Sequence, residues 1–282
     1  NSRMKNLTIL ICLLFGVNSF AQVNILNAST PSEIGIQNFD QKQSDNDSFL
    51  KFDYIDERDI LWSKIVYEKI DLNEKLNFPL LFPVNDETYA ENRKSLWRIL
   101  KENIINKRIT ELYFDRNDNF KDKMSFKDVM EVISFSELIN GVQTPAEELK
   151  SIDITAYRIK GIWYFDKRQG EMKYRLLGLM PVGKNLKDDD GKNNTDLFWI
   201  WYPSIRKILH EEKVFNEKNN ARSISFDQLL ISRRFSSFIY KEDNVYGDRS
   251  IKEYKIPGLE SILESERIKN EILNFEQDMW NR

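Results

Sequence analysis

Residues 157–166 have the sequence YRIKGIWYFD, and residues 172–179 have the sequence MKYRLLGL. The first run is rich in aromatic and β-branched side chains, which favour strands over helices, and the second run is an apolar segment that contains Tyr174. The segment Asp166–Gly170 joins the two runs and ends in glycine, which adopts the backbone conformations that a tight hairpin turn needs. These residues therefore predict an antiparallel β-hairpin.

The segments around this hairpin predict further strands and helices. Residues 196–202, DLFWIWY, predict a third strand that ends before Pro203. Nearer the N-terminus, the spacing of apolar residues predicts one helix over residues 59–72 and a second helix from Ser95. We therefore expect an α+β fold of mixed helices and antiparallel strands.

The last part of the chain predicts an amphipathic helix over residues 259–282, after the Pro257-Gly258 break. Its apolar residues at helical spacing are Leu259, Ile262, Leu263, Ile268, Ile272, Phe275 and Met279. Packing of this helix on its own domain is the favoured interpretation. Docking of the helix on a neighbouring subunit is the alternative, and the apolar stripe alone does not separate the two.

A weak internal repeat suggests how the globular part is organised. An apolar segment that ends in proline at residues 81–83 is followed by the helix from Ser95 and a predicted strand at residues 109–114. A similar order recurs between residues 201 and 240. The repeat predicts two similar αβ lobes, an N-terminal lobe over residues 49–150 and a β-rich lobe over residues 151–258, before the C-terminal helix.

The N-terminal residues have the pattern of a secretory signal peptide. Met4 and Lys5 precede an almost wholly apolar run at residues 7–17, which is too short to span a bilayer. Ser19 and Ala21 then supply the small-x-small exit that a signal peptidase recognises. We expect a signal peptide over residues 1–21, residues 1–3 being a short leader. The polar residues 22–48 predict a flexible leader in the mature chain.

Cysteine content and charge narrow the classes of partner. Cys12 is the one cysteine of the 282 residues and lies within the predicted signal peptide, so the mature chain would have no disulfide or thiolate metal site. Ile11 before it does not fit a lipoprotein acylation signal, and we expect no direct membrane insertion. The net charge of −3 gives no general attraction for nucleic acid, and we expect no nucleic-acid partner.

Candidate catalytic residues are sparse. His210 is the one histidine, and it lacks the second histidine of a helical zinc-protease motif. Residues 188–191 resemble part of a calcium loop, but Leu186 stands at the first ligand position. We expect no catalytic residue, cofactor or metal. A periplasmic hydrolase with a carboxylate pair acting on a glycan, and a monomeric periplasmic binding protein, remain open alternatives.

Several segments resemble the gliding-motility family GldN, called PorN in non-gliding relatives. They lie at residues 59–72, 77–80, 197–206, 233–246 and 264–269. The motifs Trp-Ile-Trp-Tyr-Pro and Arg-Arg-Phe-Ser-Ser are the most specific of them. The resemblance extends over nearly all of the chain from Phe52 onward.

This resemblance implies a periplasmic structural subunit of the type IX secretion system and gliding machinery in Bacteroidota. The implied location is the periplasm, peripheral to the outer membrane through a lipoprotein partner. The implied partners are a GldK-type outer-membrane lipoprotein, neighbouring copies of the chain in a ring, and a GldM-type periplasmic motor component. No catalytic residue is implied.

A ring subunit needs two unlike surfaces, because head-to-tail contacts close a ring only when they are heterologous. Aromatic and arginine side chains are frequent anchors of such contacts. The partner-interface candidates are therefore Trp199, Trp201, Tyr202, Arg206, Arg233, Arg234, Phe235 and Tyr246. Where these residues lie on strands, alternate side chains point into the core instead.

Overall fold

The computed structural model describes residues 49–85, 93–116, 118–136, 138–139, 142–143, 146–188, 193–214, 224–245, 248–256 and 258–280. Residues Phe49–Arg282 form one compact unit. The predicted signal peptide and flexible leader lie outside the described residues.

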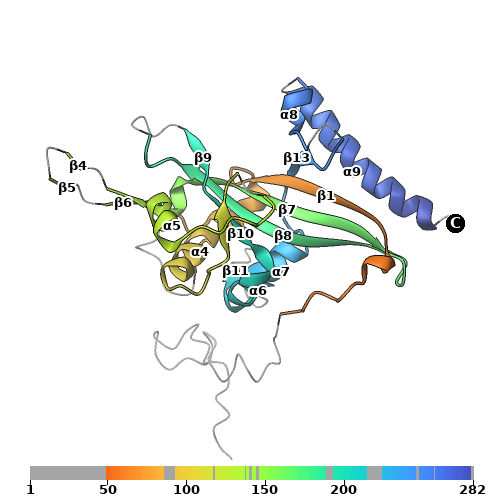
Figure 1. Ribbon diagram of the computed structural model, residues 1–282, viewed down its shortest axis with the longest axis horizontal. Helices are drawn as coiled ribbons and strands as arrows, with labels where there is room; N and C mark the ends of the chain where they lie inside the picture. Colours follow the sequence, from red (N-terminus) through yellow and green to blue (C-terminus); the bar gives the residue numbers. More distant parts are fainter. Residues whose placement is uncertain are drawn as a thin grey trace, which may run out of the picture. The chain divides into compact units, whose positions relative to one another are not determined.

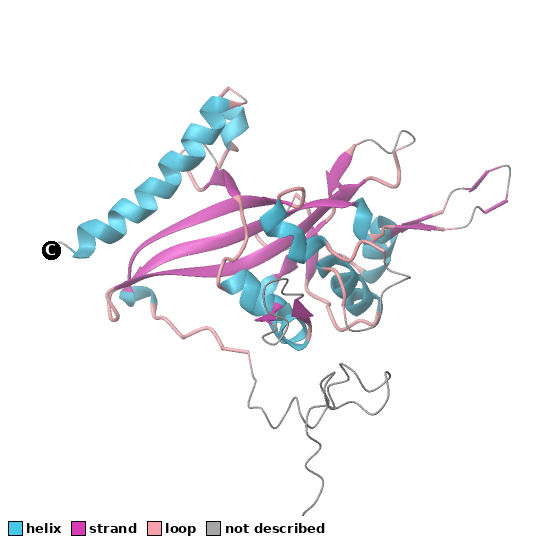
Figure 2. Cartoon of the chain, turned by 180° about the vertical axis from the view of Figure 1, so that it is seen from behind, coloured by secondary structure: helices cyan, strands magenta, loops and turns pink. Residues whose placement is uncertain are grey.

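The main sheet is built around the predicted hairpin. Strands β7 (Ile154–Asp166) and β8 (Glu171–Lys184) pair in antiparallel fashion, from Asp166 opposite Glu171 to Ile154 opposite Gly183. Gly170 in the turn has a φ of 67°, a conformation that glycine adopts without steric cost. The hairpin prediction is confirmed, and Figure 2 shows the two strands as the long centre of the sheet.

Within the described residues the main sheet has seven strands, and six of them follow one path. That path is β13 (Phe238–Glu242), β1 (Ile60–Asp71), β7, β8, β10 (Phe198–Trp201) and β2 (Leu112–Phe114), with β9 (Asn194–Asp196) also paired to β8. Smaller antiparallel pairs are β3 (Ser134–Phe135) with β6 (Glu147–Glu148), β4 (Leu138–Ile139) with β5 (Val142–Gln143), and β11 (Lys213–Val214) with β12 (Ile224–Ser225). The predicted strands at 109–114 and 196–202 are confirmed in shortened form.

The predicted helix over residues 59–72 is wrong, because this segment is strand β1. Its apolar residues satisfy both helical spacing and the two-residue period of a strand. Pairing decides between them, since β1 has antiparallel neighbours on both sides, β7 and β13. Hydrogen bonding to two partners overrides local helical spacing.

The apolar segment that ends at Pro83 does not form a strand. Phe78–Leu81 form the short helix α3, and Phe82 is extended after it. Pro79 lies at the start of this helix, where a missing backbone N–H costs nothing. In the first member of the predicted repeat, Leu81 ends a helix and Phe82 is extended, whereas in the later counterpart Trp201 ends a strand.

Three of the remaining helices begin directly after a capping serine. The remaining helices are α4 (Leu96–Ile105), α5 (Phe126–Ile133), α6 (Tyr202–Glu211), α7 (Phe226–Ile231), α8 (Ile251–Tyr254) and α9 (Leu259–Trp280), with 3-10 turns η2 (Glu57–Asp59), η3 (Lys75–Asn77) and η4 (Ser151–Asp153). The hydroxyls of Ser95, Ser125 and Ser225 accept a backbone N–H at the starts of α4, α5 and α7. The predicted helix from Ser95 is confirmed, and the predicted C-terminal helix is confirmed over Leu259–Trp280, residues 281–282 lying outside the described residues.

Two hydrophobic clusters cover one face of the sheet. The larger joins β7, β8 and β10 to α4, α6 and α7, and its largest buried side chains are Trp97, Tyr157, Phe198, Tyr202 and Phe226. The smaller consists of Val66, Ile239, Ile251, Ile268 and Ile272, and it joins β1 and β13 to α8 and α9. The half-buried Tyr174 of β8 packs against both clusters.

The arrangement of faces follows from alternation along β1. Val66 belongs to the smaller cluster and Ile70 to the larger, and residues four apart on a strand share a face. Tyr67 points to the opposite face, where it packs with Met180 and Trp199. The helices α4, α6 and α7 therefore lie on the same face of the sheet as α9, beyond one end of the region that α9 covers. Figure 1 shows α9 running along β1.

The sheet contains strands from both of the predicted lobes. β1 and β2 come from residues 49–150, whereas β7, β8 and β10 come from residues 151–258. β1 lies directly between β13 and β7. A boundary between residues 150 and 151 thus crosses a continuous sheet.

Candidate functional site: a surface on the C-terminal helix

Helix α9 is held to the sheet by one side. Gly258, with a φ of 113°, directly precedes it, which fits the predicted break. Ser265, Ile268 and Ile272 are buried and recur at intervals of three and four residues, so they lie on one side of the helix. The Ser265 hydroxyl accepts the backbone N–H of Ile239 at 3.0 Å, which ties α9 to β13.

Aromatic stacking fixes the C-terminal half of α9. The ring of Phe275 stacks on Trp62 of β1 with a centroid separation of 4.8 Å and an interplanar angle of 18°. It also meets Phe165 of β7 edge-on at 6.0 Å. Such pairs add about 0.5–1.5 kcal/mol each beyond the burial of their area.

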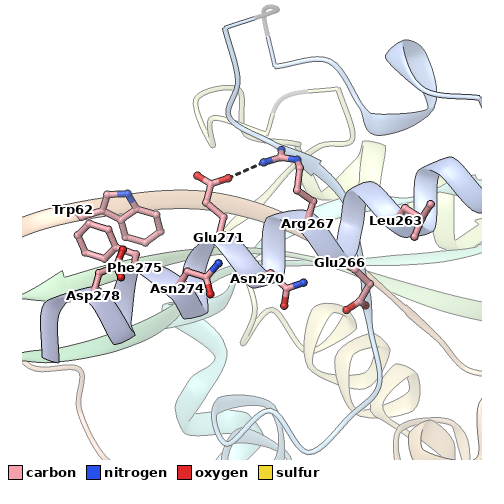
Figure 3. A pocket seen from close by; sticks show the side chains of 9 residues that line it. All are labelled: Trp62, Leu263, Glu266, Arg267, Asn270, Glu271, Asn274, Phe275 and Asp278. Carbon is pink, nitrogen blue, oxygen red and sulfur yellow. Dashed lines mark hydrogen bonds and ion pairs between the residues drawn. The ribbon is translucent and has the colours of Figure 1, made fainter. Parts of the chain in front are cut away.

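A charged clasp, formed by Lys64, Glu242, Glu264, Arg267 and Glu271, joins α9 to the two strands beneath it. The Lys64 ammonium lies 2.8 Å from Glu242 and 2.7 Å from Glu271. The Arg267 guanidinium contacts Glu264 at 2.8 Å, Glu271 at 2.9 Å and Glu242 at 3.3 Å. Figure 3 shows the bond between Arg267 and Glu271, which lie one turn apart on α9.

The clasp shifts the titration of its members. Burial raises the pKa of Glu271, but hydrogen bonds from Lys64 and Arg267 outweigh burial and hold that pKa below its ordinary value of 4.5. Burial lowers the pKa of Lys64, but hydrogen bonds to Glu242 and Glu271 outweigh burial and raise that pKa above 10.5. Ionised Glu271 therefore stabilises the fold at pH values above the ordinary pKa of glutamate. Protonated Lys64 stabilises the fold at pH values below the ordinary pKa of lysine.

We expect acid to loosen α9. As the pH falls from about 6 to about 3, the stabilisation from ionised Glu271 is lost, since the folded-state pKa is depressed. The protection factors of the α9 backbone amides, which compare each exchange rate with the intrinsic rate at the same pH, should fall over this range more than those in β7 and β8. The variant Glu271→Gln should flatten the response of α9, and unchanged α9 protection throughout the range would count against the clasp.

The other side of α9 exposes a group of large aliphatic side chains. Leu259 is 72% exposed, Ile262 61% and Leu263 58%, and Ile256 just before the helix is also exposed. These four residues are named here the α9 edge. Single exposed aliphatic residues are common, but adjacent ones in one patch mark sites of interaction with other proteins or with membranes.

An open groove continues from the α9 edge along the same helix. Leu263 and Glu266 line one end of it, Asn270 lies in the middle, and Trp62 and Phe275 close the other end. Figure 3 shows the side chains of Leu263, Glu266 and Asn270 projecting from the helix. The surface thus combines aliphatic, polar and charged groups on one rigidly attached helix, as docking surfaces do.

Four predicted interface residues lie inside the protein. Trp199, Tyr202, Arg206 and Phe235 are all buried, with Arg206 only 2% exposed. These four side chains contact other parts of the same chain and are not available to a partner. The physical reason is that β10, α6 and the segment after α7 contribute directly to the hydrophobic clusters of the sheet.

Arg206 and Tyr202 instead belong to a buried polar cluster with Asp227 of α7. The Asp227 carboxylate accepts the Tyr202 hydroxyl at 2.8 Å and the Arg206 guanidinium at 3.1 and 3.2 Å. Burial, and then the charge of Asp227, raise the pKa of Tyr202, so its hydroxyl stays a donor. The cluster fastens α6 to α7.

Arg233 is partly buried and acts within the chain. Its φ is 53°, and its guanidinium donates to both oxygens of Glu68 on β1, at 3.0 and 2.6 Å. It also lies 4.4 Å from the ring centre of Tyr174. Arg233 therefore links the end of α7 to the sheet at the junction of the two hydrophobic clusters.

The other three predicted interface residues have different surroundings. Trp201 is half-buried, with its ring 4.8 Å from that of Phe120. Arg234 is exposed. Tyr246 lies outside the described residues. An interface role for Trp201, Arg234 and Tyr246 stays a prediction.

The division of α9 into two sides could have been found from the sequence. Leu263 and Ile268 are five residues apart, which turns a helix by about 140°. They therefore cannot share one narrow stripe, and the helix presents two apolar surfaces. The sequence does not reveal the clasp, because Lys64 lies in the segment predicted as a helix over residues 59–72, which is strand β1.

Other kinds of site find little support in the described residues. They contain no grouping of three or more His, Cys, Asp or Glu side chains placed to bind a metal ion. In the same part of the chain, no helix is long and apolar enough to cross a membrane. His210 is half-buried on α6, with Nδ1 3.5 Å from the Ser225 hydroxyl.

The fold and this surface define an α+β protein with a sheet-anchored C-terminal helix whose outer side is suited to contact other proteins. Residues 55–281 match the family model described as gliding motility associated protein GldN. The chain belongs to the GldN family, and the resemblance seen in the sequence is confirmed. The family is a structural component associated with gliding motility and type IX secretion, and it is not a known enzyme family. No match to a curated protein was found.

Proposed function

We propose that the chain is a periplasmic structural subunit of the type IX secretion and gliding machinery. It forms a ring with a GldK-type outer-membrane lipoprotein, contacts neighbouring copies of itself and approaches a GldM-type motor component. The match to the GldN family over residues 55–281 supports this proposal. The apolar run at residues 7–17, with Ser19 and Ala21 after it, supports export to the periplasm.

The α9 edge is the observation that carries the proposal. Leu259, Ile262 and Leu263 expose aliphatic surface from a helix whose other side is fixed by Ile268, Ile272 and the Phe275 stack. A surface attached in this way loses little conformational freedom when a partner binds, which favours tight association. We assign the α9 edge to the contact with the lipoprotein.

Co-purification tests the proposal. An affinity-tagged chain isolated from cells that make the GldK-type lipoprotein should retain that lipoprotein and fractionate with the outer membrane. In cells that lack the lipoprotein, the chain should move to the soluble periplasmic fraction. Retention of the chain in the cytosol with residues 1–21 intact would contradict the location. Conversion of a glycan, lost on changing a specific carboxylate, would favour the hydrolase alternative.

A further inference from the structure

The segment Phe49–Asp53, named here the strap, lies against the body of the protein without forming helix or strand. The ring centre of Phe52 lies 4.1 Å from the guanidinium carbon of Arg206 and 4.9 Å from that of Arg175. Phe49 lies 5.1 Å from the same carbon of Arg206. The strap is thus held mainly by stacking of two phenyl rings on two arginines.

The backbone of the strap is held by the same two arginines. Arg206 donates to the carbonyl of Leu50, and Arg175 donates to the carbonyl of Asp53 at 2.6 Å. The Asp53 carboxylate lies 3.7 Å from the ammonium of Lys173. Lys173, Arg175 and Arg206 therefore form an acceptor site for a short extended peptide, using charge-assisted hydrogen bonds and cation–π contacts.

Release of the strap would leave no unpaired buried charge. Arg206 is also bound to Asp227 at 3.1 and 3.2 Å, and that ion pair does not involve the strap. Arg175 is half-buried and can be hydrated when the strap leaves. Loss of the strap therefore avoids the large penalty of breaking a buried ion pair.

The strap and the residue directly after it expose two large apolar side chains. Leu50 is 85% exposed and Tyr54, directly after the strap, is 86% exposed. Large apolar side chains that are exposed on and directly after a detachable segment favour burial between two molecules. The strap also precedes residues 55–281, the part that matches the GldN family.

We infer that the strap of one copy occupies the acceptor site of a neighbouring copy. Each contact to Lys173, Arg175 and Arg206 can form in the same way within one chain or between two, as in domain swapping. In an assembly that holds copies side by side, the high effective concentration favours exchange. This deepens the proposed function, because it names the segment that joins one copy to the next.

Zero-length carbodiimide cross-linking tests the exchange, since Asp53 and Lys173 can be joined through an amide bond. Equal amounts of ¹⁴N-labelled and ¹⁵N-labelled chain are unfolded together, refolded at high concentration, cross-linked, digested and analysed by mass spectrometry. We expect Asp53–Lys173 peptides that combine both isotopes. The pair Lys64–Glu242, 2.8 Å apart within the body, should give peptides of one isotope only.

A matched variant distinguishes exchange of the strap between copies from cross-links formed by chance collision of two copies. Phe49→Ala combined with Phe52→Ala removes both stacking rings and should lower the mixed-isotope Asp53–Lys173 product by about tenfold. Asp53–Lys173 peptides that all carry a single isotope would overturn the inference, as would mixed peptides that the double variant leaves unchanged. This readout uses the chain alone, so failure to bind the lipoprotein would not affect it.

Discussion

The paired substitution Ile262→Lys and Leu263→Lys is expected to weaken binding of the GldK-type lipoprotein by about 100-fold or more. Each aliphatic side chain, once buried in an interface, contributes roughly 1.5–3 kcal/mol, and a lysine at the same position must also be desolvated. Two such losses exceed the 2.7 kcal/mol that corresponds to about 100-fold in affinity. Titration of purified lipoprotein against the labelled chain, wild type and variant, measures the change.

The variant should fold normally, because both side chains are already exposed in the free protein, at 61% and 58%. Surface changes of this kind alter stability by about 0.5 kcal/mol or less. Ile152→Lys is the matched control, since Ile152 is 64% exposed but lies in η4, away from α9 in the sequence. Equal affinities for all three proteins would remove the α9 edge from the interface.

Asp227→Ala is expected to destabilise the fold by about 3–5 kcal/mol, because it leaves the buried guanidinium of Arg206 without its carboxylate partner. The Tyr202 hydroxyl would also lose its acceptor. Urea denaturation followed by circular dichroism measures the loss. Adding Arg206→Met to the same chain should restore part of the stability, since it removes the uncompensated charge.

Glu148→Ala serves as the comparison for this effect. Glu148 pairs with Lys101 at 2.8 Å but is 55% exposed, and such surface pairs contribute about 1 kcal/mol or less. The sequence alone suggested that Tyr202 and Arg206 bind a partner. If that were so, Asp227→Ala would cost no more stability than Glu148→Ala and would act on partner binding instead.

The sequence predicts well those parts of the fold in which the local residues favour only one type of secondary structure. The hairpin of β7 and β8 combines an aromatic and β-branched run in β7 with a turn that ends in Gly170. Ser95 caps α4, as expected of a serine that directly precedes a helical pattern. By contrast, residues 60–71 suit either period, and only their pairing with β7 and β13, distant in sequence, makes them a strand.

The candidate site is harder to predict, because cores and interfaces draw on the same residue types. Trp199 and Phe235 have the composition of interface anchors, yet the sheet and its helices bury both. Arg206 is buried as part of an ion pair that sequence cannot reveal, since Asp227 lies on another helix. Helix α9 was predicted correctly, but its exposed edge becomes evident only once Ile268 and Ile272 are seen to face the sheet.

Negative-stain electron microscopy of particles purified with the GldK-type lipoprotein tests whether this chain acts as a ring subunit. We predict ring-shaped particles that contain both proteins, and separate small particles when Ile262→Lys and Leu263→Lys are introduced together. Isolated monomers of the wild-type chain in the presence of folded lipoprotein, or rings from which the chain is missing, would contradict that role.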